Sequence, residues 1–266
     1  LTGDPTRTYS NGVASAPNQL VNVEDLMQKI SIGTGLWTFA RETGSEGAIA
    51  PQGTENTDKS QIDYDVTMVD LSTEYTAGIL VISKKMLNNV GFIEGWLPNA
   101  LRRDFFKQIN SEYYTTLSTS LPASTLTSGN KVERLVQDIA TLMNNNFTPN
   151  YIVINPASWA DLVLTAGPSG TGDYSTPATL IQAPNGLMQL AGVNIVVATW
   201  VPADAYLIAD FSYFTKVVTE GLSVNFYHEA EDSVRKNNVM VRIEEMHGLA
   251  MGRLDCGVIG DFTAVP

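Results

Sequence analysis

Residues whose side chains could do chemistry are concentrated between Arg235 and Cys256. They are Asn237, Glu244, Glu245, His247, Asp255 and Cys256. Two adjacent carboxylates, a histidine and the single cysteine of the chain could bind a metal ion, or serve as acid, base or nucleophile in catalysis. The same residues could instead form the polar side of a structural strand. Whether the protein is an enzyme depends on how this stretch folds.

The pattern within the stretch favours a strand over a catalytic centre. In NNVMVRIEE (237–245), apolar and other side chains alternate, which is typical of a strand with one buried face. Glu244 and Glu245 are neighbours, so they point to opposite faces and cannot form a paired-carboxylate site from this segment alone. His247 and Cys256 lack the HxxxH or CxxC spacing of metal ligands. The expected apolar side consists of Val239, Val241 and Ile243.

Three further motifs resemble functional sites, but each has a simpler structural interpretation. GPSGTGDY (167–174) follows a predicted helix rather than a strand, so it does not match a dinucleotide-binding loop. INPASW (154–159) is typical of a strand that leads into a helix, and no GxSxG elbow is present. HEAED (228–232) could hold a cation such as calcium, although a solvated turn explains it more simply. We therefore expect no catalytic residues, cofactor or metal.

The charge of the chain argues against tight binding of nucleic acid. The 266 residues include 28 acidic and 16 basic side chains, which gives a net charge of −12. Binding DNA or RNA requires lysines and arginines that neutralise phosphates. We therefore expect no specific nucleic-acid binding. No apolar run approaches the ~20 residues that span a bilayer, so we expect no membrane contact either.

The longest predicted element is a helix over residues 83–117 that would serve as a spine. Its apolar residues recur every four positions and form one broad stripe. Pro98 is expected to kink or interrupt it near its first turns. A second amphipathic helix is predicted over 131–147. The stripe of the long helix consists of Ile93, Leu97, Leu101, Phe105, Ile109, Tyr113 and Leu117.

A long segment rich in glycine, threonine and serine, residues 33–62, contains the strand-like stretch 36–40 and leads into the strand-like stretch 62–83. Together they predict a two-stranded loop that projects from the body. An isolated hairpin is marginally stable in water, so this loop is expected to pack against a partner subunit. One face of its second strand would carry Ile62, Tyr64, Val66 and Met68.

Helices and strands follow one another without regular βαβ alternation, which predicts an α+β fold. A buried strand and helix are expected over 151–165. Further strands are expected at 186–200, 205–211, 216–232 and 237–245, and a last strand at 248–262.

The order of these features resembles the major capsid proteins of tailed phages, which have the Hong Kong 97-type fold. The resemblance covers nearly the whole chain. It rests on ISKKMLNNVGFIEGWLPNALRRDFF, YIVINPASWADL, LAGVNIVV, YLIADF and RKNNVMVRIEE in this order. It implies an N-terminal arm (1–30), an extended loop (33–78), a peripheral domain with the spine helix (79–130 and 212–247) and an axial domain (131–211 and 248–266).

Some members of this family join their subunits by an isopeptide bond between a loop lysine and an asparagine, with a glutamate as base. By this resemblance, Asn237 falls at the acceptor position and Glu244 at the base position. Gly47 and Ala50 stand where the lysine would be, and Lys59 is well displaced. The resemblance thus implies a shell without covalent cross-links.

The resemblance implies a subunit that assembles into hexamers and pentamers of an icosahedral, DNA-containing head, formed in the bacterial cytoplasm. It also implies a portal, a scaffolding region, a maturation protease and a cement protein as partners. Removal of a scaffolding region would suit a chain that starts at Leu1. Residues expected at subunit contacts are Trp37, Phe39, Arg41, Glu46, Lys59, Arg102, Arg103, Arg235 and Lys236.

Two other functions remain open at this point. One is an encapsulin-like shell, which has the same fold but encloses a cargo enzyme instead of DNA. The other is a small hydrolase or carbohydrate-binding protein that would use Glu244 and Glu245.

Overall fold

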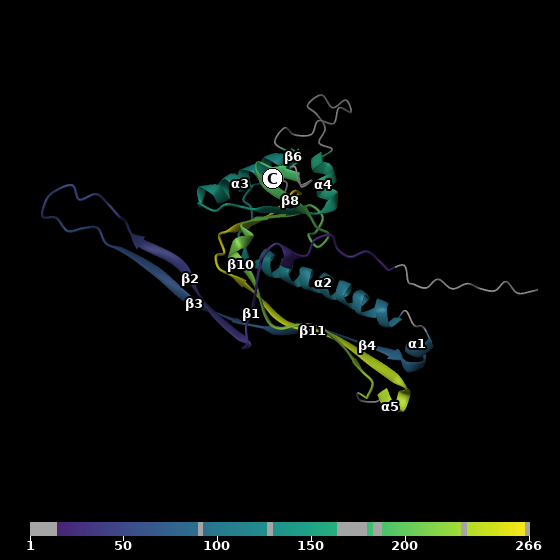
Figure 1. Ribbon diagram of the computed structural model, residues 1–266. Coiled ribbons are helices and arrows are strands. Elements are labelled where there is room, and N and C mark those ends of the chain that lie inside the picture. The colour runs from purple at the N-terminus through teal and green to yellow at the C-terminus, as the bar shows by residue number, and fades with distance from the viewer. Residues whose placement is uncertain are drawn as a thin grey trace, which may run out of the picture.

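The computed structural model describes residues 15–89, 93–126, 130–163, 180–182, 188–229 and 233–263. Within these ranges the strands form a four-stranded sheet, a six-stranded sheet and a two-stranded hairpin, and helices pack against the larger sheets (Figure 1). This mixture confirms the expected α+β class. The hairpin extends away from the rest of the chain, as predicted for the loop between residues 33 and 78.

The four-stranded sheet has the strand order β1-β10-β11-β4. Its first pair is parallel and the other two pairs are antiparallel. The short helix α5 (Ser233–Lys236) lies between the two long central strands in sequence. The strands are β1 (Gln28–Ser31), β4 (Glu74–Ser83), β10 (Phe214–Tyr227) and β11 (Asn238–Met251).

Strand β11 confirms the alternation predicted from the sequence. Its side chains alternate between buried and half-buried positions from Asn238 to Gly248. Val239 and Val241 are fully buried and pack with Leu97 of the helix above the sheet. The buried face of β11 is therefore the face that packs against the helix.

Helix α2 (Ile93–Ser120) is the predicted spine and follows the short helix α1 (Lys84–Asn89). It runs through Pro98 without ending, so of the kink or interruption expected there, the interruption does not occur. Pro98 lies in the second turn, so it removes only one backbone hydrogen bond near the helix start. The buried apolar stripe after Pro98 stabilises the remainder of the helix. That part of the stripe contains Phe105, Ile109, Tyr113 and Leu117.

The six-stranded sheet has the order β12-β9-β5-β8-β7-β6 and is flanked by α3 (Lys131–Asn144) and α4 (Pro156–Val163) (Figure 1). Asn130 begins α3 with a capping box, since its side chain accepts the Glu133 N–H at 2.9 Å. The strands are β5 (Tyr151–Ile154), β6 (Leu180–Gln182), β7 (Met188–Leu190), β8 (Val193–Val197), β9 (Ala205–Ala209) and β12 (Gly257–Asp261).

The C-terminal part differs from the single strand expected over 248–262. Strand β11 continues to Met251, and only then does the chain cross to the other sheet to form β12. Two glycines make this crossing strand fit closely against β9. A Cβ at Gly257 would lie 2.7 Å from that of Ala209, and one at Gly260 would overlap the ring of Tyr206.

The hairpin consists of β2 (Leu36–Gly47) and β3 (Ile62–Ser72), which pair from Leu36–Ser72 to Gly47–Ile62. The pairing shifts register between Glu42 and Gly44. Gly47 ends the first strand at φ +84°, a backbone conformation that side-chain-bearing residues rarely adopt. Beyond it, residues 48–61 form the tip of the hairpin, which carries no strand.

We expect Gly260→Ala to lower the free energy of unfolding by about 1–3 kcal/mol, because the added methyl group displaces the buried Tyr206. This displacement would also break the 2.6 Å hydrogen bond that the Tyr206 hydroxyl donates to Asp138. Urea denaturation of the unassembled subunit measures the change. Gly221→Ala is the matched control, since nothing lies within 4 Å of its added Cβ. Equal stability of the two variants would contradict this packing.

Candidate functional site

The reactive residues between Arg235 and Cys256 do not converge on one site. Glu244 lies on the face of β11 away from α2 and forms an ion pair with Arg242. Glu245 and His247 lie on the opposite face, where each is less than 5% exposed. The two adjacent glutamates therefore point to opposite sides of the sheet, as predicted.

The two C-terminal members of this group are also engaged elsewhere. Asp255 forms an ion pair with Arg253 at 3.0 Å. Cys256 is fully buried, and its thiol donates to the Arg253 carbonyl at 3.2 Å. Burial raises the pKa of the Cys256 thiol to about 12, so it stays protonated and is a poor nucleophile at neutral pH.

A buried ionic cluster lies on the face of the four-stranded sheet that packs against α2. The Lys216 ammonium contacts the carboxylates of Glu245, at 2.6 Å, and of Glu24. Glu24 also pairs with Lys29 at 2.9 Å, so two carboxylates face two ammonium groups. Burial alone would raise the pKa of Glu24, but the hydrogen bonds and charges of Lys216 and Lys29 outweigh it and lower that pKa.

His247 extends this cluster to the spine helix. Its Nδ1 is 2.7 Å from the Tyr113 hydroxyl, and its Nε2 is 3.1 Å from the Thr76 hydroxyl. Burial, together with the positive charge of Lys216, lowers the pKa of His247 to about 4. The imidazole is therefore neutral at pH 7, and both ring nitrogens have hydrogen-bond partners. These contacts join β4, β11 and α2 and are structural.

The described N-terminal segment is attached to the spine helix through one buried amide. The Asn110 side chain accepts the Val23 N–H at 2.9 Å and donates to the Asn22 side chain at 3.0 Å. It also donates to Gln19. The sequence reasoning missed Asn110, Glu24 and Lys216. The sequence pattern that could have indicated Asn110 is a polar residue beside the apolar stripe of a helix. For Glu24 and Lys216 it is a charged residue next to an apolar run.

Three of the predicted contact residues lie on one face of the hairpin. The Trp37 and Phe39 rings stack at 5.0 Å, and the Arg41 guanidinium lies over Phe39 at 5.6 Å. Arg41 also donates to the Met251 carbonyl of β11. The part of this face around Trp37, Phe39 and Arg41 is half-buried against its own chain.

The opposite face of the hairpin is exposed and carries a row of apolar side chains, with Thr38, Glu42 and Asp70 beside them. Register places Met68 opposite Ala40 and Tyr64 opposite Ser45. The exposed fractions are 54% for Leu36, 58% for Tyr64, 59% for Val66 and 65% for Met68. We call these residues the hairpin stripe. Exposed apolar patches of this kind typically mark an interaction surface.

A second exposed stripe lies on β4, on the face away from α2. Leu80 and Ile82 point toward the core, whereas the alternate side chains are in solvent. These are Tyr75, Ile79 and Val81, each more than 50% exposed, and we call them the β4 stripe.

The structure does not bring Asn237 and Glu244 together. Asn237 lies at the turn before β11, with φ +51°, and its carbonyl accepts the Lys84 N–H at 2.8 Å. Seven strand positions separate it from Glu244, which corresponds to roughly 23 Å. Asn237 and Glu244 of one chain therefore cannot act as acceptor and base at the same isopeptide bond.

The remaining predicted residues lie apart on the surface. Gly47 ends β2, and the Ala50 N–H donates to the Ser60 hydroxyl at 3.0 Å near the hairpin tip. Arg103 is half-buried on α2. The exposed members are Glu46 and Lys59 on the hairpin, Arg102 on α2, and Arg235 and Lys236 on α5.

No group of three or more His, Cys, Asp or Glu side chains in the described ranges is arranged to hold a metal ion. Residues 230–232 of HEAED and the whole of GPSGTGDY lie outside the described residues. None of the helices in the described part of the chain is both long and apolar enough to cross a membrane.

The sequence matches the model of the phage capsid family over residues 6–253. The chain belongs to the phage capsid family. No functionally curated protein matches it. The membership confirms the expectation of a capsid protein and favours it over a hydrolase or carbohydrate-binding protein.

Solved structures share the fold at low sequence identity. The capsid of the native GTA particle has a TM-score of 0.75 at 12% identity and covers 98% of this chain and 95% of its own. The structure from Mycobacterium phage Adephagia has a TM-score of 0.69 at 14% identity, and the match covers 97% of this chain and 94% of the phage chain. The structure from Gordonia phage Cozz has a TM-score of 0.70 at 12% identity, and the match covers 96% of this chain and 90% of the phage chain. The expected Hong Kong 97-type fold is confirmed.

The buried His247 predicts a pH-dependent stability between pH 6.5 and about 4. The unfolded chain takes up a proton near pH 6.5, whereas folded His247 does so only near pH 4. The free energy of unfolding should therefore fall as the pH is lowered through this window, by roughly 3 kcal/mol.

Urea denaturation at several pH values measures this dependence. His247→Gln should flatten it, whereas His228→Gln, at the other and exposed histidine, should leave it unchanged. An unchanged slope in His247→Gln would contradict the assignment.

Proposed function

We propose that this capsid protein assembles into hexamers and pentamers that close into the icosahedral, DNA-containing head of a tailed phage. The exposed hairpin stripe is the observation that supports this proposal most directly. The hairpin extends from the body, so its own chain leaves these apolar side chains in solvent (Figure 1). A second copy of the chain would bury them.

We also propose a division of the chain into the parts of a capsid subunit. The arm is 1–30 and the extended loop is 33–78. The peripheral domain, 79–130 and 212–247, contains α2 and much of the four-stranded sheet. The axial domain, 131–211 and 248–266, contains the six-stranded sheet. The long strands β10 and β11 connect the two domains.

The β4 stripe is the surface proposed to receive the hairpin of a neighbouring subunit. Both stripes are apolar, and both lie on extended strands with side chains at alternate positions. Each contact would be modest alone. Many identical contacts in a closed shell reinforce one another, since each additional subunit binds where several partners are already held.

The shell is proposed to lack isopeptide cross-links. No lysine stands at Gly47 or Ala50, and Lys59 is in the exposed tip of the hairpin. Asn237 and Glu244 would be remnants of an acceptor and a base. Without these bonds, the shell would be held by the overlap of each arm and extended loop with neighbouring subunits. A cement protein would be a further partner.

The remaining partners follow from the proposed role in a tailed phage. The subunit would assemble in the bacterial cytoplasm with a portal and a scaffolding region, and a maturation protease would act before it becomes part of the virion. A cellular compartment of the same fold would contain a cargo enzyme instead, so the contents of purified particles separate the two functions.

Val66→Asp is expected to abolish closed shells, because it places a charge in the hairpin stripe where a neighbouring subunit would bury it. Electron microscopy measures shell formation, and circular dichroism checks that the subunit still folds. Thr67→Asp introduces the same charge on the opposite face of β3 and should leave assembly intact. Shells of normal yield from Val66→Asp would refute the role of the stripe.

Denaturing gel electrophoresis tests the absence of cross-links. Purified particles boiled in detergent should give one band at the monomer mass of 28.8 kDa. The proposal fails if a ladder of covalent oligomers persists under reducing conditions.

A further inference from the structure

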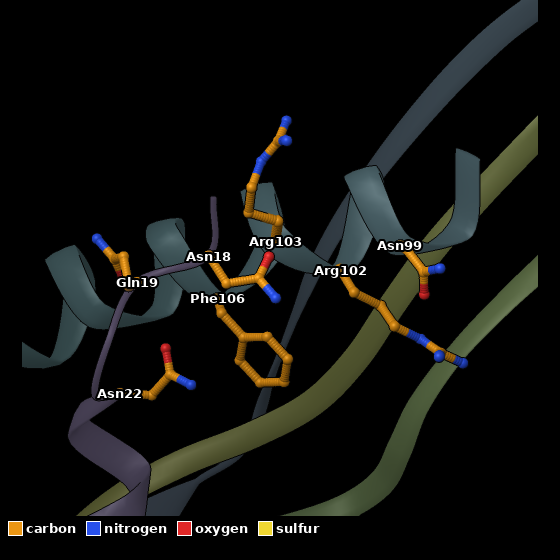
Figure 2. A pocket seen from close by; sticks show the side chains of 7 residues that line it. All are labelled: Asn18, Gln19, Asn22, Asn99, Arg102, Arg103 and Phe106. Carbon is orange, nitrogen blue, oxygen red and sulfur yellow. The ribbon is translucent and has the colours of Figure 1, made fainter. Parts of the chain in front are cut away.

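A polar groove lies between the N-terminal segment and α2 (Figure 2). Its volume of about 290 Å³ is near the lower end of the range for small-molecule pockets, so it suits a single ionic group better than a whole metabolite. Its lining contains two guanidinium groups, four amide side chains and one aromatic ring, and no carboxylate. The lining residues are Asn18, Gln19, Asn22, Asn99, Arg102, Arg103 and Phe106.

The two arginines of the groove are held differently. Arg103 is fixed, because it donates to the Ala16 carbonyl at 3.3 Å and pairs with Asp104 at 3.1 Å. Arg102 is exposed and forms no ion pair or hydrogen bond with any described residue. A guanidinium can donate two parallel hydrogen bonds to one phosphate group, and the neighbouring amides supply further donors.

Two cations without an ion pair lie at or beside this groove: Arg102 lines it, and Lys107 lines the adjoining pocket together with Arg103 and Asp104. Most lysines and arginines of the described residues are hydrogen-bonded or ion-paired within the chain. Among the described residues, the side chains without such a partner are Lys59 on the hairpin, Lys84 and Lys85 on α1, and Arg102 and Lys107 on α2. Apart from Lys59, these cations follow the two consecutive helices.

The exposed hairpin, in contrast, carries acidic side chains. Asp63 and Asp65 lie on the face opposite the hairpin stripe, and both are exposed. A polyanion would be repelled from that part of the subunit and could approach the helix side. Because Arg102, Arg103 and Lys107 line two adjoining pockets along α2, they can engage neighbouring phosphates of one strand rather than a single free anion.

We propose that the groove at Arg102 and Arg103, extended by Lys107, binds the phosphodiester backbone of packaged duplex DNA without regard to sequence. The inference rests on the proposed function, because that function brings DNA to one side of the shell. It places the α2 side of the subunit on the inner surface. The net charge of −12 keeps the interaction weak, so that the DNA can move while it is packaged and released.

The test is fluorescence anisotropy of a labelled 30-base-pair duplex with unassembled subunits at several salt concentrations between about 50 and 200 mM. The double variant Arg102→Gln with Lys107→Gln should bind about tenfold more weakly. Its salt dependence, the slope of log K against log salt, should fall by about 2, since each lost phosphate contact removes about 0.9.

Lys59→Gln is the matched control, because it removes an equally free cation from the hairpin and should change neither affinity nor slope. The inference is overturned if this control weakens binding as much as the double variant, if the wild type does not bind at 50 mM salt, or if inorganic phosphate displaces the duplex at equal ionic strength. Shell formation, followed separately by electron microscopy, reports on the proposed function and not on the groove.

Discussion

The exposed apolar side chains on the outer face of the β2–β3 hairpin are not buried by their own chain, and the proposed function depends on their burial by a second copy. A two-stranded hairpin has no core, so its inner face rests on Met251 through Arg41, while its outer face stays in solvent. A subunit of this shape is incomplete as a monomer. The family membership supplies the context in which copies of the chain complete one another.

The body from which the hairpin projects must be rigid for such contacts to add up over a shell. The buried ionic cluster contributes to this rigidity, because Lys216 joins Glu24 near the N-terminus to Glu245 of the central strand. Removing one partner would leave a buried charge unpaired, which typically costs several kcal/mol. The cluster thereby fixes the segment around Glu24 against the sheet and the spine helix.

Periodicity in the sequence predicted the parts of the fold whose contacts are local or repetitive. The stripe of α2 from Leu97 to Leu117 and the alternation of β11 follow directly from side-chain spacing. Pro98 does not interrupt α2, because a proline near the start of a helix removes only one hydrogen bond, and a long buried stripe outweighs that loss.

Contacts between distant parts of the sequence left no comparable signal. Lys216 and Glu24 are separated by 192 positions, and nothing in either segment alone indicates the partner. The crossing of the C-terminal strand to the second sheet depends on the fit of Gly257 and Gly260 against β9, which only the packed structure reveals. The free cations of α1 and α2 likewise became visible only when the other cations were seen to be paired.

The central claim is that the hairpin stripe is buried by a second copy of the chain. A cryo-electron microscopy map of the assembled particle at side-chain resolution tests it most directly. The account predicts that Tyr64, Val66 and Met68 lie against an apolar surface of a neighbouring subunit. A map in which these side chains remain in solvent, or fold back onto their own subunit, would contradict it.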